Sequence, residues 1–115
     1  MRHDDSVYVE HMLATARKAV AKLETVTRDA FDQDENLRLA LTHLLQIIGE
    51  AARRVSAAYQ ADHPSIPWRT ITGMRHKVVH DYLNVDDLIV WQTVKNDPPR
   101  LIDALEHVLS DDRTP

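Results

Sequence analysis

The residue types best suited to chemistry gather in one ten-residue stretch, from Gly73 to Tyr82. It holds an arginine, two histidines, an aspartate and a tyrosine, namely Arg75, His76, His80, Asp81 and Tyr82. Arginine carries a permanent cation, histidine exchanges a proton near neutral pH, and tyrosine offers a hydroxyl group. Together these groups suit chemistry on a phosphate.

His76 and His80 are four residues apart, a spacing that places both on one face of a helix, about 40° apart. Zinc sites use this spacing, and the segment is comparable with the His-Glu-x-x-His motif of metalloproteases. Lys77, however, stands where that motif has its general-base glutamate. We therefore expect no metal here and no cofactor elsewhere.

Arg75 and His80 are five residues apart, which on a continuous helix separates them by about 140°. They can act on one phosphate only if the helix ends or bends near His80, or if a second chain completes the site. Acid–base cleavage of RNA needs a proton acceptor for the 2′-hydroxyl, a proton donor for the leaving 5′-oxygen and a cation on the phosphate. One chain fills two of these roles without metal, and a symmetric dimer fills all three.

The elements that must position these residues are helices. The chain has only two glycines, and its apolar residues recur every three or four positions. We expect one helix from an N-cap at Ser6 to about Thr27, and a turn over 27–34 in which Asp32 and Glu35 resemble a capping box. A long helix should then run from about Gln33 to Ala61, with Ala58 on its buried face.

The prolines of segment 63–67 should end the long helix, and Pro67 can open a third helix that ends between His80 and Asn84. A fourth helix is expected from Asp86, and a short last helix is expected to open at Pro98 with Asp97 as its cap. No segment reads as a strand. The prediction is an all-α bundle of four main helices plus a short C-terminal one, with residues 1–115 forming a single domain.

Composition narrows the class of protein. The chain has 115 residues, a net charge of −4 and no cysteine, which excludes disulfides and thiolate chemistry. A nonspecific coat on nucleic acid is disfavoured because such proteins are usually basic. No apolar run is long enough to span a bilayer, and the first residues lack the apolar core of a signal peptide. We expect a cytoplasmic protein with no membrane partner.

The remaining polar and aromatic residues are interpreted as structural. Trp68 and Trp91 have helical spacing and are expected in the core, and Arg53 and Arg54 are expected on a solvated face. The scattered histidines are expected at the surface or half-buried with a partner: His3, His11, His43, His63 and His107.

The pattern Arg75-x-x-x-x-His80-x-Tyr82 resembles the signature of the HepT-like toxins in the HEPN superfamily. The resemblance extends to the flanks, which are Ile47–Ala52 on the long helix, Pro67–Met74 before the motif, and Leu83–Asp86 and Val90–Val94 after it. It covers most of the chain from about Leu37 to Leu109.

The resemblance implies a HEPN-type helical bundle that forms a homodimer and acts as a metal-independent endoribonuclease toxin. Arg75 and His80 would be the catalytic residues in a cleft between two chains, with His76 and Asp81 in supporting roles. The family often has asparagine where this chain has His76. The partner would be a MntA-like nucleotidyltransferase antitoxin that transfers AMP to Tyr82 and silences the toxin.

Two other functions remain open on the same residues. One is a non-catalytic HEPN module that binds a nucleotide or partners a nucleotidyltransferase, with Arg75 on the phosphate. The other is a dimerising helical bundle in which the polar motif merely closes an interface.

Overall fold

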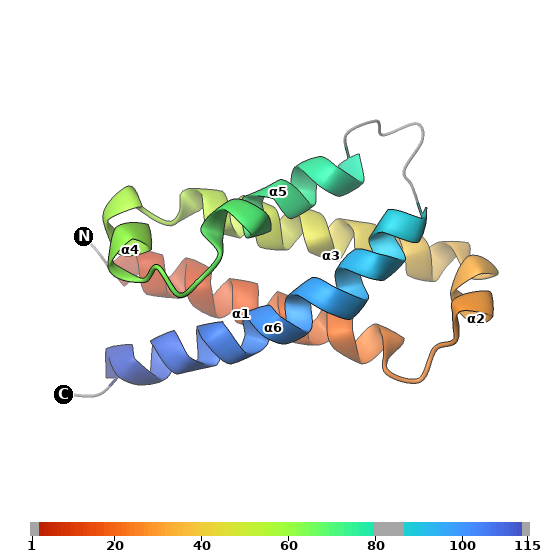
Figure 1. The fold of residues 1–115 in the computed structure, drawn as a ribbon, viewed down its shortest axis with the longest axis horizontal. Coiled ribbons are helices and arrows are strands. Elements are labelled where there is room, and N and C mark those ends of the chain that lie inside the picture. Colours follow the sequence, from red (N-terminus) through yellow and green to blue (C-terminus); the bar gives the residue numbers. More distant parts are fainter. Residues whose placement is uncertain (1–2, 80–86, 114–115) are drawn as a thin grey trace.

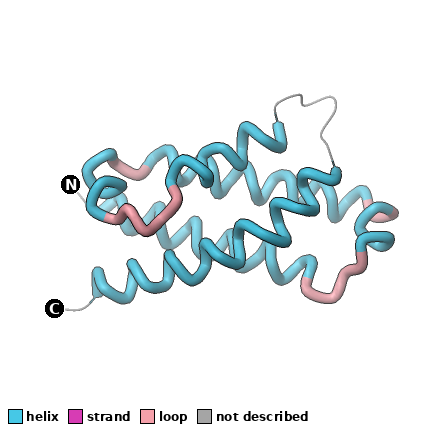
Figure 2. The backbone as a smooth tube through the Cα atoms, in the orientation of Figure 1, coloured by secondary structure: helices cyan, strands magenta, loops and turns pink. Residues whose placement is uncertain are grey.

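Six helices and no strand make up the part of the chain that the computed structural model describes, residues 3–79 and 87–113, with side chains described for 5–73 and 90–110 (Figures 1 and 2). The helices are α1 (His3–Leu23), α2 (Arg28–Asp32), α3 (Glu35–Arg54), α4 (Ala57–Asp62), α5 (Trp68–Val79) and α6 (Asp87–Arg113). The four longer helices run alternately up and down the molecule, with α2 and α4 at opposite ends (Figure 1). The predicted all-α class is confirmed.

The bundle is held together by apolar stripes on α1, α3 and α6. On α3 the buried residues Leu41, Leu45, Ile48 and Ala52 recur every three or four positions, as the sequence predicted. This spacing gives one helix a continuous apolar face that another helix can cover. Helix α1 packs against α3 and α6, while α3 packs mainly against α1 and α5.

The long second helix is interrupted, contrary to prediction. Helix α3 ends at Arg54, Val55 has an extended backbone, and α4 restarts after Ser56. Ser56 caps α4, since its side-chain oxygen accepts a 3.1 Å hydrogen bond from the Tyr59 amide. Ala58 was expected on the buried face of the long helix. It is exposed, because the interruption at Val55 means that α4 does not continue the apolar face of α3.

The expected break at Pro98 is also wrong, because α6 continues through Pro98 and Pro99. Neither proline can donate to the carbonyl four residues earlier, which normally weakens a helix. The buried residues on both sides nevertheless keep one helical face: Val90, Val94, Leu101, Leu105 and Val108. Packing along this face outweighs the local signal, so the short helices are α2 and α4 rather than a C-terminal one.

Several helix starts differ from the predicted ones. Within the described residues α1 begins at His3, so Ser6 lies inside it and is not a cap. The predicted turn over 27–34 contains α2, capped by Thr27. Asp34, and not Asp32, caps α3 by accepting a 3.0 Å hydrogen bond from the Leu37 amide.

Candidate functional site

Helix α5 carries the first part of the predicted site. The backbones of Arg75 and His76 lie in its last two turns, and the described part of α5 ends at Val79. His80, Asp81 and Tyr82 lie outside the described residues, and the side chains of Arg75 and His76 are also outside them. The assembly of these five residues into one site therefore stays a prediction, and the structure defines the scaffold that precedes it.

The start of α5 is held by a cluster of three rings: Tyr59 of α4, His63 of the loop that follows, and Trp68 of α5 itself. Trp68 is buried, and its indole nitrogen Nε1 donates a 3.0 Å hydrogen bond to the His63 carbonyl oxygen. The His63 ring lies 4.1 Å from the Tyr59 ring, and its Nδ1 is 3.0 Å from the Tyr59 carbonyl oxygen. The Tyr59 ring in turn meets Trp68 edge-on at 6.3 Å. These contacts hold the first turn of α5 against the bundle.

A second contact anchors the corner from which α4 and α5 extend. Asp5, a buried residue of α1, accepts two 2.8 Å hydrogen bonds from Ser56, one from the backbone amide and one from the hydroxyl. The sequence contained the Ser56 cap signal, but nothing in it indicated a partner 51 positions away. Asp5 therefore has a structural role, which is to hold α1 against the start of α4.

No described part of the fold requires glycine at position 73. A Cβ atom built on it meets no atom within 4 Å, and no glycine in the described residues has a positive φ. Glycine inside a helix costs about 1 kcal/mol relative to alanine. On α5 it lies nearly opposite the buried residue Ile71, because two helical positions span about 200°. Its open face points away from the core.

A cavity of about 310 Å³ lies between α5 and α6, beside the outward face of α5. Polar and apolar residues both line it. They come from the loop before α5, the start of α5 and the middle of α6: Ser65, Pro67, Thr70, Ile71, Asp97, Arg100, Leu101 and Ala104. Arg100 is exposed and Asp97 is half-buried. The sequence gives no sign of this cavity, because its lining residues come from two segments that lie far apart in the chain.

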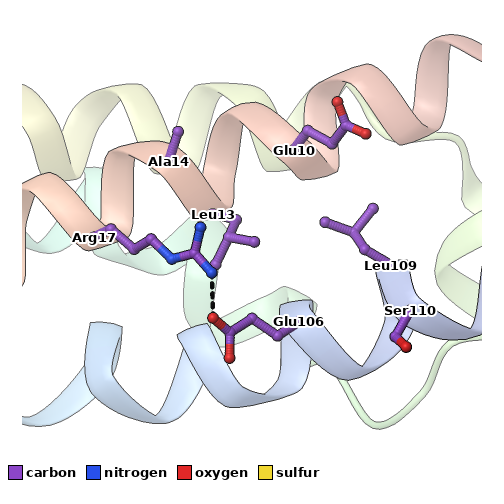
Figure 3. Close-up of a pocket in the computed structure, with 7 residues that line it drawn as sticks. All are labelled: Glu10, Leu13, Ala14, Arg17, Glu106, Leu109 and Ser110. Carbon is purple, nitrogen blue, oxygen red and sulfur yellow. Dashed lines mark hydrogen bonds and ion pairs between the residues drawn. The ribbon is translucent and has the colours of Figure 1, made fainter.

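A larger cavity, about 680 Å³, lies between α1 and α6 and does not include α5 (Figure 3). An ion pair between Arg17 and Glu106 bridges the two helices there, while Leu13 and Leu109 supply the apolar floor. The opposite charges of Arg17 and Glu106 neutralise each other. None of its described lining residues belongs to the predicted motif.

The other residues singled out from sequence serve mainly structural roles. Trp68 is in the core as predicted, and Trp91 is half-buried with its ring 5.1 Å from that of Phe31. Arg53 and Arg54 are exposed, and both lie within 4.0 Å of Glu50. His11, His43 and His107 are exposed.

Among the described residues, no group of three or more histidine, cysteine, aspartate or glutamate residues could hold a metal ion. Nor does any helix in this part of the chain have the length and apolar character needed to cross a membrane.

The fold and the motif residues on α5 together define an all-α bundle of the HEPN type. The chain belongs to the family described as Ribonuclease HepT-like, whose model matches residues 12–108. This confirms the resemblance on which the site prediction rests.

Three relatives illustrate the match. The chain is 38% identical over 88 residues to a protein of Thermococcus cleftensis named as a probable ribonuclease HepT, covering 73% of this chain and 80% of the relative. It is 29% identical over 106 residues to a protein of Caldanaerobacter subterraneus named as a candidate RNase, covering 92% and 95%. A third relative, from Methanocaldococcus jannaschii and also named as a candidate RNase, is 26% identical over 107 residues, covering 93% and 98%. No solved structure gave a significant match.

Proposed function

We propose that this protein is a metal-independent endoribonuclease and the toxin of a toxin–antitoxin pair. The observation that carries the proposal is the family match over residues 12–108, combined with the intact motif of Arg75, His80 and Tyr82. The relatives named as ribonucleases support the same reaction class.

The proposed reaction is a transfer of the phosphate within the RNA strand. His80 removes the proton from a 2′-hydroxyl, the 2′-oxygen forms a bond to the adjacent phosphorus, and the bond to the 5′-oxygen breaks. The leaving 5′-oxygen takes a proton from His80 of the second chain. Arg75 stabilises the charge that develops on the phosphate. His76 and Asp81 help to orient these groups.

A homodimer is required because one chain provides only one histidine at the His80 position. The separation of about 140° between Arg75 and His80 on a continuous helix also favours a site that two chains complete. The monomer would then be inactive on its own.

Regulation is proposed to act on Tyr82. A MntA-like nucleotidyltransferase transfers AMP to the Tyr82 hydroxyl oxygen, which attacks the α-phosphorus of ATP and displaces pyrophosphate. The added phosphate beside Arg75 and His80 would block the site by volume and charge. Co-expression with that enzyme should add the mass of one or more AMP groups at Tyr82, and an unmodified Tyr82 would contradict this part.

The cleavage proposal is tested with purified protein and total RNA in EDTA. The wild-type protein should cut the RNA, while Arg75→Ala and His80→Ala should lose on the order of 100-fold or more in rate. Arg53→Ala and His43→Ala are the matched controls, since both residues are exposed on α3. Intact RNA with the wild-type protein would instead support the non-catalytic nucleotide-binding module.

A further inference from the structure

We propose that the outward face of α5, together with the cavity between α5 and α6, binds the single-stranded RNA that flanks the cleaved phosphate. The inference rests on the proposed ribonuclease function and adds to it the surface that holds the substrate. Three residues define this surface, here called the α5 track: Arg69, Gly73 and Arg100. Thr70 and Ser65 add hydroxyl groups at its edge.

Charge is the first observation in its favour. Helix α5 has three arginine or lysine residues and no carboxylate among its 12 residues, in a chain whose net charge is −4. Arg69 and Arg100 are both exposed, and neither forms an ion pair with a carboxylate of the described residues. A local excess of cations on an acidic protein marks a place where a polyanion can bind.

The position of Gly73 is the second observation. It follows Arg69 by four residues and Thr70 by three, so these positions share one face of the helix. The open space at Gly73, which no part of the described chain fills, allows a phosphate backbone to approach α5 closely. A side chain at this position would stand between the strand and the helix.

The cavity supplies the third observation. Arg100 of α6 lines it together with the hydroxyl-bearing residues Ser65 and Thr70, and it has room for a phosphate and its sugar at about 310 Å³. Guanidinium and hydroxyl groups are common phosphate ligands in nucleic-acid complexes. Among the described residues of this lining, Asp97 is the one carboxylate, and it is half-buried. The arrangement places phosphate contacts on both sides of Thr70.

The track leads towards the predicted catalytic residues. Arg69 precedes Val79, the last described residue of α5, by ten positions, or about 15 Å along the helix axis. A strand of a few nucleotides bound along α5 would therefore reach Val79, which is next to His80 in the sequence.

RNA affinity at several salt concentrations tests the proposal, with a short fluorescein-labelled single-stranded oligoribonucleotide as the probe. The His80→Ala protein serves as the background, so that the probe is not cut. Arg69→Ala and Arg100→Ala should each weaken binding about three- to tenfold and reduce the slope of log affinity against log salt by about 0.7. Lys18→Ala, an exposed cation of α1, should leave both quantities unchanged.

Gly73→Leu tests the open face independently of charge. This variant should keep its helix content and melting temperature, because nothing in the described chain occupies the space, yet bind the probe more weakly. If it unfolds, the space is not open and the inference is wrong. If it loses its dimer while RNA affinity is unchanged, the face contacts a second copy of the chain, which also overturns the proposal.

The outcomes separate this inference from the proposed function. If Arg69→Ala and Arg100→Ala behave like Lys18→Ala while cleavage depends on Arg75 and His80, the track is wrong and the ribonuclease stands. If the wild-type protein cuts no RNA, the catalytic proposal fails, but the salt dependence still decides whether α5 binds RNA.

Discussion

Arg75 and His80 have different tasks in the proposed reaction, and this difference explains why both residue types are needed. The guanidinium of arginine keeps its charge at any physiological pH, so it can hold a phosphate throughout the reaction. Histidine can gain or lose a proton near neutral pH, so it can move a proton at each step. Lys77 stands where a zinc protease would have its glutamate.

At the same scale, Asp5 is predicted to matter for stability. Asp5→Ala removes both hydrogen bonds to Ser56, including the one that satisfies the Ser56 backbone amide. We expect the free energy of unfolding to fall by about 1–3 kcal/mol in urea denaturation. Asp103→Ala, which removes an exposed carboxylate from α6, is the control. Equal stability of the two variants would show that the Asp5 contacts contribute nothing.

At the scale of elements, regular apolar spacing predicted which segments are helical but not where each helix begins and ends. The stripes on α1 and α3 were expected from sequence and are buried in the structure. The break after Arg54 was not expected, because the apolar pattern continues across Val55 and Tyr59 and hides the cap at Ser56. Asp5, the hydrogen-bond partner of Ser56, lies 51 positions earlier in the chain, and such long-range contacts leave no periodic signal in the sequence.

For the candidate site, the motif could be predicted from the sequence, but the surfaces beside it could not. The motif residues are adjacent in sequence, so their types and spacing were visible at once. The surfaces beside them were not, because Thr70 and Arg100 come from separate helices that only the fold brings to one cavity. Gly73 could be noticed in the sequence, but only the structure shows that no described part of the chain fills the space beside it.

The continuity of α6 gives a prediction at this scale. Pro99 is exposed inside the helix, where it lacks an amide donor and conflicts with the preceding turn. Pro99→Ala should therefore raise the free energy of unfolding by about 1–3 kcal/mol. The first turn of a new helix tolerates proline well. A loss of stability on substitution would mean that two helices meet here.

At the scale of the whole molecule, the proposed cleavage depends on the association of two chains. A net charge of −4 opposes general binding of nucleic acid, so the RNA contact must be local, and the basic helix α5 is the element suited to it. The bundle provides a rigid support for that helix through α3 and through the aromatic group at its start. The second chain would provide the second His80.

The most direct test is the activity of a heterodimer with one wild-type chain and one His80→Ala chain, isolated through two different affinity tags and assayed on RNA in EDTA. If each site needs a histidine from both chains, this heterodimer should cut RNA scarcely faster than the His80→Ala homodimer. A heterodimer with one His43→Ala chain should keep full activity. Retention of about half the wild-type activity by the His80→Ala heterodimer would show that each chain holds a complete site, and would contradict the account.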